Sequence, residues 1–132
     1  MYIHGSKDDP AMWDALGPIA TDRSAIAECG GPIYSSPGMH WFVARDAGIV
    51  VGIASMRLTT KAIWYDYGYV IPERRGQGVF TALARARDAE AVHTQLPRMV
   101  AVRETRWKYY KQRGWKIDSR RGSWIYASKD AP

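Results

Sequence analysis

The residues most suggestive of chemistry form a basic, glycine-rich turn, residues 74–78, within the stretch YVIPERRGQGVF. A strand-like apolar run precedes the turn, and an alanine-rich, helix-like run follows it. The first turn of a helix leaves backbone N–H groups unpaired at the positive end of the helix dipole, and both features favour a phosphate. Glycines let the backbone approach that phosphate without an intervening Cβ. The turn is therefore predicted to bind a ligand that carries phosphate.

Two common phosphate-binding motifs do not fit this turn. A P-loop requires G-x-x-x-x-G-K-[ST], which the sequence lacks, and a dinucleotide fingerprint requires a third glycine where Thr81 stands. That fingerprint also opens a βαβ unit, whereas three strand-like runs come first here, at residues 40–46, 48–60 and 62–72. Their short connections predict an antiparallel meander rather than a parallel sheet.

The rest of the pattern predicts a mixed α+β domain. Helix-start signals at residues 9–10 and 21–22 predict two short helices, and Gly17-Pro18 is predicted to end the first near residue 16. A short strand is possible at residues 2–3. After the turn we expect a helix that ends before Pro97, a strand at 98–102, a helix at 104–113, and a hairpin of 115–119 and 123–128 across 120–122. The predicted class is a mostly antiparallel sheet flanked by helices, in the order β-α-α-β-β-β-α-β-α-β-β.

This element order, together with two motifs, resembles the GNAT superfamily of acyl-CoA-dependent N-acyltransferases. The similarity covers nearly the whole chain, which is expected to be one domain over residues 1–132. The resemblance implies acetyl-CoA as cofactor and direct transfer of the acetyl group to a primary amine in a ternary complex. The first motif is V-x-P-x-x-R-G-x-G, at Val70, Pro72, Arg75, Gly76 and Gly78. The second is similar to Y-x-x-x-G-F and lies at Tyr110 and Gly114-Trp115.

The resemblance also implies where the cofactor binds. The loop amides would hold the pyrophosphate of CoA, and the strand that ends at residues 70–71 would splay from its neighbour to pair with the pantetheine arm. Phe80 stands where the family motif has Gly or Ala. Arg74, Arg85 and Arg87 could reach the phosphates or simply solubilise the helix. The expected cofactor-binding residues are Val70, Ile71, Arg75, Gly76, Gln77, Gly78, Val79, Phe80 and Thr81.

Acetyl transfer to an amine requires a base for the amine and an acid for the leaving thiolate. By resemblance, Tyr110 is the predicted acid; the alternative is a core tyrosine that packs the late helix. Asp66 is the predicted base, because strand alternation puts it on one face with Gly68 and Val70. Its alternatives are a solvated or ion-paired carboxylate and a substrate-binding group.

The positive charge of the chain is concentrated near its end. The whole chain has a formal net charge of +6. Residues 98–132 hold ten Lys/Arg and only three Asp/Glu, and six Trp or Tyr residues are interleaved with them. Cations with aromatic rings are typical of nucleic-acid surfaces, although a solvated basic surface has the same composition. We therefore expect an acceptor on DNA or RNA, such as a modified base or an aminoacyl-tRNA, or on an acidic macromolecule. The candidate substrate residues are Tyr34, Arg103, Arg120 and Arg121.

A different class of function remains open, a GNAT-like module that binds nucleic acid and has lost transfer. Affinity for acetyl-CoA would separate the two. The single cysteine, Cys29, and an N-terminus without a signal-peptide pattern favour the cytoplasm. The three histidines lack metal-ligand spacing, so no metal site is expected, and no apolar run is long enough to span a membrane. A monomer or a homodimer is expected.

Overall fold

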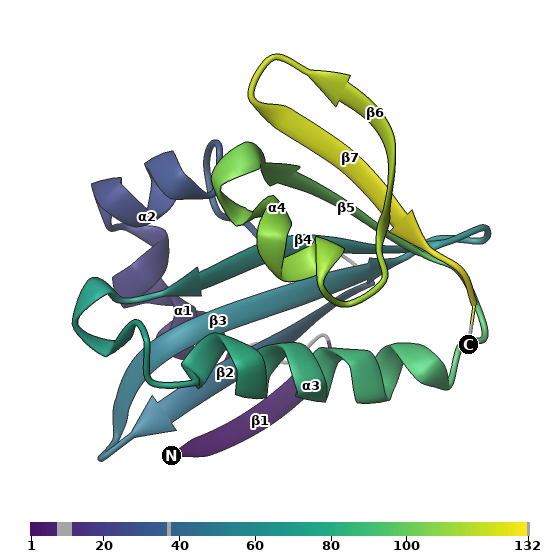
Figure 1. The fold of residues 1–132 in the computed structure, drawn as a ribbon. Helices are drawn as coiled ribbons and strands as arrows, with labels where there is room; N and C mark the ends of the chain where they lie inside the picture. Colours follow the sequence, from purple (N-terminus) through teal and green to yellow (C-terminus); the bar gives the residue numbers. More distant parts are fainter. Residues whose placement is uncertain (8–11, 37, 132) are drawn as a thin grey trace.

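The computed structural model describes residues 1–7, 12–36 and 38–131, and in these ranges the fold is built on one seven-stranded sheet (Figure 1). The strand order is β1-β2-β3-β4-β5-β7-β6, and every neighbouring pair is antiparallel except β4 and β5. The strands are β1 (Tyr2–Lys7), β2 (Met39–Asp46), β3 (Ile49–Leu58), β4 (Ile63–Val70), β5 (Arg98–Arg103), β6 (Lys116–Arg121) and β7 (Trp124–Lys129). The predicted fold class, a mixed and mostly antiparallel sheet flanked by helices, is confirmed.

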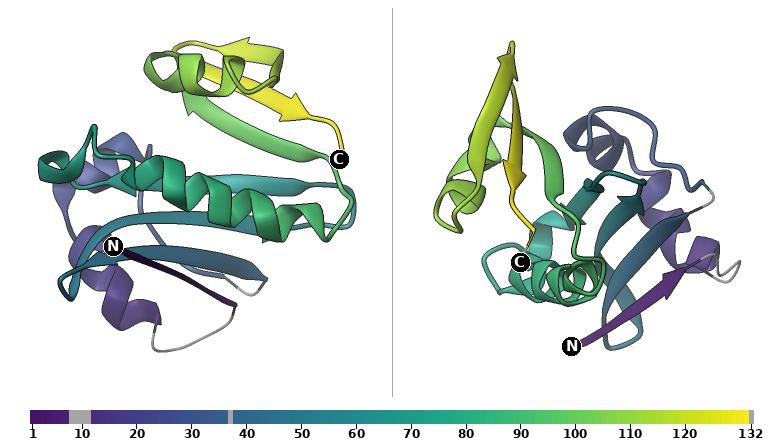
Figure 2. Two further views of the ribbon diagram at one scale, coloured as in Figure 1. Left: turned by 60° about the horizontal axis from the view of Figure 1, so that its bottom comes forward. Right: turned by 90° about the vertical axis from the view of Figure 1, so that its right-hand side faces the viewer.

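Helices cover both faces of the sheet, as the view along its edge shows (Figure 2, right). Alternate residues of the central strands divide the core. Val43 and Ile53 pack with α1 and α2, whereas Phe42 and Ala54 pack with α3 and α4. The helices are α1 (Met12–Ala20), α2 (Arg23–Glu28), α3 (Val79–Val92) and α4 (Glu104–Lys111), with a short 3₁₀ turn, η1 (Pro72–Arg74), before α3.

The strands β4 and β5 separate along their length. They pair only from Ile63 to Tyr65, and from there their ribbons diverge (Figure 1). The β3–β4 register also shifts at this point, because two β4 residues, Asp66 and Tyr67, lie opposite Ser55 alone. A bulge of this kind bends the strand and can end its pairing with a neighbour. The sheet therefore opens between β4 and β5, beside the glycine-rich turn.

Three details of the sequence-based prediction were wrong or fall outside the structure. The first helix does not end at Gly17-Pro18 but continues to Ala20. Proline inside a helix removes an N–H donor and crowds the carbonyl one turn earlier, but here the buried side chains of Leu16 and Ile19 hold this segment against the sheet. The predicted helix start at residues 9–10 lies outside the described residues. Arg120 and Arg121 belong to β6, so the hairpin turn is at residues 122–123.

Among the described residues, no helix is both long enough and apolar enough to cross a membrane.

Candidate active site

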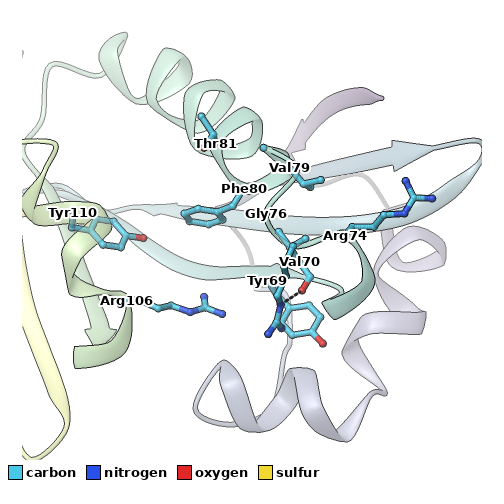
Figure 3. Close-up of a pocket in the computed structure, with 11 residues that line it drawn as sticks. Tyr69, Val70, Arg74, Gly76, Val79, Phe80, Thr81, Arg106 and Tyr110 are labelled. Carbon is cyan, nitrogen blue, oxygen red and sulfur yellow. Dashed lines mark hydrogen bonds between the residues drawn. The ribbon is translucent and has the colours of Figure 1, made fainter.

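A cavity of about 310 Å³ lies where the glycine-rich loop, the end of β4 and α4 meet (Figure 3). It is lined by most of the residues that were predicted to bind the cofactor and by Tyr110, the predicted acid. Tyr69 and Arg106 also line it and were not predicted, and Arg74, for which a phosphate contact was one of two alternatives, lines it as well. Ile71 and Gln77 are not among its lining residues. The lining is Tyr69, Val70, Arg74, Arg75, Gly76, Gly78, Val79, Phe80, Thr81, Arg106 and Tyr110.

The loop itself is shaped for an anion. Gly76 and Gly78 have φ angles of 75° and 83°, which favour glycine, and a Cβ added at either would meet no atom within 4 Å. Gly78 is the N-cap of α3 and offers no side chain to the first turn, where Ala82 N donates to Gly78 O as the helix begins. The N–H groups of the first turn of α3 have no acceptor within the helix, and a helix start of this kind suits a phosphate.

Tyr110 comes from the facing helix and is 6% exposed. Tyr109 and Trp115 hold its ring by edge-on contacts, with centroids 5.1 and 5.3 Å away. Its hydroxyl points into the cavity (Figure 3). Tyr110 also lines a smaller cavity of about 40 Å³ between β4 and β5, so its side chain stands where the two cavities meet.

Asp66 lies on the wall of that smaller cavity, in the β4 bulge. The bulge breaks the strand alternation, so the prediction that Asp66 shares a face with Gly68 and Val70 was wrong. Arg57 Nε donates to its Oδ2 at 3.1 Å, and 24% of the Asp66 side chain is exposed. Burial raises the pKa of Asp66 above its ordinary value, and the charge and hydrogen bond of Arg57 oppose this rise only in part. A carboxylate with a raised pKa is a stronger proton acceptor, which suits the predicted base.

The raised pKa gives a stability prediction. A folded state that raises the pKa of a carboxyl group favours its protonated form, so ionised Asp66 costs stability above the folded pKa, and the cost disappears below the unfolded value of about 3.9. We expect Asp66→Asn to raise the Tm at pH 7.5 and the gain to vanish near pH 3. Thermal unfolding across this range tests it, with Asp118→Asn on exposed β6 as the control. An equal Tm difference at both pH values would contradict it.

Phe80 occupies the space where a smaller residue is usual in the loop motif. Its ring lies over Gly68 of β4, so close that a Cβ on Gly68 would be 2.9 Å from Phe80 Cε2. The same ring makes an edge contact with Tyr109 at 5.0 Å between centroids. Phe80 therefore narrows the passage between the loop and α4 without closing the cavity that it lines.

Arg87 is a site residue that was interpreted wrongly from the sequence, where it was expected to reach phosphate or solvent. It is 2% exposed and its Nη1 donates to Ser55 O and Tyr67 O, both at 3.2 Å, at the β3–β4 bulge. Its guanidinium also stacks over the Tyr65 ring at 3.9 Å. Arg87 thus fixes the bulge that carries Asp66. The spacing was a usable signal, because Arg87 continues the apolar stripe of Val79 and Leu83 at intervals of four residues.

A larger hollow of about 540 Å³ opens on the side of α2. Its charged lining is three arginines, Arg75, Arg103 and Arg106, and one carboxylate, Glu28. Glu28, Arg103 and Arg106 also line the small cavity between β4 and β5. The hollow thus adjoins the opening in the sheet, as an acceptor entrance would, and carries excess positive charge.

The four predicted substrate residues do not come together. Arg103 lines the hollow and stacks over Trp124 at 4.6 Å. Tyr34 is 60% exposed on the loop before β2 and contacts Tyr67 edge-on. Arg120 pairs with Glu104 at 3.1 Å, and Arg121 lies over Tyr126 at 5.8 Å, both on the C-terminal hairpin. Only Arg103 therefore adjoins the cavities described above.

Comparisons with known proteins agree with this geometry. A family model described as the acetyltransferase (GNAT) family matches residues 8–115. No curated protein sequence matches the chain.

Solved structures of low sequence identity share the fold over almost their full length. Escherichia coli ElaA is 10% identical with a TM-score of 0.81, and the match covers 98% of this chain and 100% of that one. An acyl-CoA N-acyltransferase from Pseudomonas aeruginosa is 14% identical with a TM-score of 0.77 and coverage of 97% and 98%. The PaiA N-acetyltransferase of Thermoplasma acidophilum, solved in complex with coenzyme A, is 14% identical with a TM-score of 0.76 and coverage of 98% and 99%.

Proposed function

The chain belongs to the GNAT acetyltransferase family and uses acetyl-CoA, and from this premise we propose that it acetylates a primary amine carried by a nucleic acid. The resemblance seen in the sequence is thereby confirmed at the level of family and cofactor. The acceptor is the new part of the proposal. The observation that carries it is the arginine-lined hollow beside the opening between β4 and β5.

The residues of the cavity fit acetyl-CoA. The loop of Gly76 and Gly78 would hold the pyrophosphate through backbone N–H groups, and Thr81 could add a hydroxyl. Acetyl-CoA supplies a thioester, whose C–S bond breaks as the amine nitrogen bonds to the acetyl carbon, so that the sulfur gains a proton and the amine loses one. Tyr110 would give its Oη proton toward the sulfur, and Asp66 would take the amine proton, directly or through water.

The charge around the hollow supports a polyanionic acceptor. Arg75, Arg103 and Arg106 outnumber the single carboxylate Glu28 there. Arg120 lies outside the hollow, on the C-terminal hairpin; its pair with Glu104 is 53% and 58% exposed, so it is weak and can rearrange around a phosphate. A positive field at the entrance would repel a free polyamine and attract an amine that is attached to a phosphate backbone.

The test measures binding and transfer together. We expect the protein to be retained on immobilised tRNA or single-stranded DNA with an affinity that falls steeply with salt, because bound cations release counterions from phosphates. Changing Arg103, which lines the hollow, to Ala should lower the logarithmic salt slope by about 0.7 for a single strand, the value expected for one phosphate contact. Labelled acetyl-CoA should transfer its acetyl group to the retained nucleic acid.

Two outcomes would contradict this acceptor. Retention of the protein on polyglutamate but not on nucleic acid would identify an acidic protein, and not a nucleic acid, as the acceptor. Full activity on a small amine, without retention on either polymer, would make the basic residues ordinary solvated surface.

A further inference from the structure

The edge of β4 that faces the opening lacks a strand partner. Pairing with β5 ends at Tyr65, so within the described ranges the remaining residues of β4 have no strand on that side. An unpaired edge is a template for an extended chain that carries amide groups. The pantetheine arm of CoA is such a chain, with two amides. The inference below rests on the proposed function in this respect, that CoA binds in the cavity beside this edge.

Two arginine side chains already occupy this edge. Arg106 Nη1 donates to Gly68 O at 2.8 Å, and Arg75 Nε donates to Val70 O at 2.9 Å. These carbonyls are two residues apart, so they lie on the same edge of the strand. Both arginines also line the 310 Å³ cavity, where Figure 3 labels Arg106. The hydrogen-bond acceptors that an extended ligand would use are thus taken by side chains.

Glu28 holds both arginines in place. Arg75 Nη2 donates to the two carboxylate oxygens of Glu28 at 2.8 and 2.9 Å, and Arg106 Nη2 donates to Glu28 Oε2 at 2.9 Å. Glu28 is on α2 and Arg106 is on α4, which cover opposite faces of the sheet. The Arg106 side chain therefore crosses the opening between β4 and β5.

We propose that Glu28, Arg75 and Arg106 form a latch across the β4 edge, which the pantetheine arm of CoA must displace when it binds. The latch is able to open, because its side chains are 35% to 42% exposed and partly exposed ion pairs contribute little stability. Arg75 can exchange Glu28 for a CoA phosphate, and Arg106 can turn toward the hollow that it lines. Opening the latch also leaves Glu28 without its two cations, at the entrance where the acceptor amine arrives.

A static brace is the alternative. In that case Arg106 would keep its bond to Gly68 O with CoA bound, and its loss would weaken CoA binding rather than strengthen it. The latch and the brace predict changes in opposite directions for one measured quantity when Glu28 or Arg106 is replaced. This quantity is the arm selectivity, defined as the dissociation constant of 3′-phosphoadenosine 5′-diphosphate, which keeps both phosphates of the pyrophosphate but lacks the arm, divided by that of CoA.

The experiment measures both dissociation constants by isothermal titration calorimetry. Glu28→Gln removes the anchor of the latch, and Arg106→Met removes the donor but keeps an apolar stem. We expect the arm selectivity to rise about fivefold in each variant, equal to about 1 kcal/mol for a partly exposed ion pair. Glu73→Gln is the matched control, because it removes an equal charge beside the loop without touching the latch. Its arm selectivity should equal that of the wild type.

Other outcomes overturn the latch. Unchanged or lowered arm selectivity in both variants would make these residues a brace. A rise in Glu73→Gln as large as in Glu28→Gln would assign the effect to charge alone. If neither the wild type nor any variant binds CoA, the proposed function itself fails, whereas CoA binding with unchanged selectivity overturns only the latch.

Discussion

Replacing Tyr110 with phenylalanine should lower kcat by about 10²–10⁴-fold and leave acetyl-CoA affinity and Tm near their wild-type values. The large effect is expected because we propose the Tyr110 hydroxyl, which points into the cavity, as the proton donor to the leaving thiolate. The small effect on folding is expected because phenylalanine keeps the ring contacts with Tyr109 and Trp115. The measurement is release of the CoA thiol during transfer to the acceptor found by the retention assay.

Tyr109→Phe is the matched control for this variant. Tyr109 is the neighbouring tyrosine on α4, and it packs against Phe80 but does not line the cavity. The kcat of the Tyr109→Phe variant should remain near that of the wild type. A Tyr110→Phe enzyme with unchanged kcat would make Tyr110 a packing residue and leave the acid unassigned.

Replacing Gly78 with valine should weaken acetyl-CoA binding by about 100-fold or more. The φ of 83° at Gly78 is unfavourable for a β-branched residue, so the loop would relax and its N–H groups would turn away from the phosphate. Loss of one or two charge-assisted hydrogen bonds, at about 1.5–3 kcal/mol each, corresponds to this factor. Calorimetry with acetyl-CoA measures it directly.

The control for backbone strain is Gly122→Val. Gly122 also has a positive φ, 57°, and no atom within 4 Å of an added Cβ, but it lies in the β6–β7 turn. The Gly122→Val variant should lose stability as Gly78→Val does, but it should bind acetyl-CoA with the affinity of the wild type. Equal CoA affinity in Gly78→Val and the wild type would show that the loop does not bind the pyrophosphate.

The glycine-rich loop and helix α3 were predictable because each depends on short-range sequence. The positive φ angles of Gly76 and Gly78 require glycine, and the α3 stripe repeats every three or four residues, so local patterns show both. The contacts of the candidate site that were missed join distant positions. Arg106 bonds to Gly68, 38 residues away, and to Glu28, 78 residues away. No local spacing encodes such pairs, since only the tertiary fold brings α2 and α4 to the same opening.

Arg87 shows a second reason why prediction from sequence stopped short. An arginine within a helix is usually read as solvated, because burial of a charge is costly unless it is compensated. Here the bulge turns two carbonyl oxygens, of Ser55 and Tyr67, toward its guanidinium and compensates part of that cost. The bulge depends on the register of β3 and β4, which the alternation of apolar residues does not specify at one-residue accuracy.

Phe80 and Gly68 constrain one another. A side chain at position 68 collides with the Phe80 ring, whereas a Gly or Ala at position 80 would leave room for it. A larger residue at position 68 therefore requires the Phe80 ring to move, and a small residue at position 80 removes that requirement. We expect Phe80→Ala to make substitutions of Gly68 less costly to stability than they are in the wild type, so that the two positions are coupled by sterics.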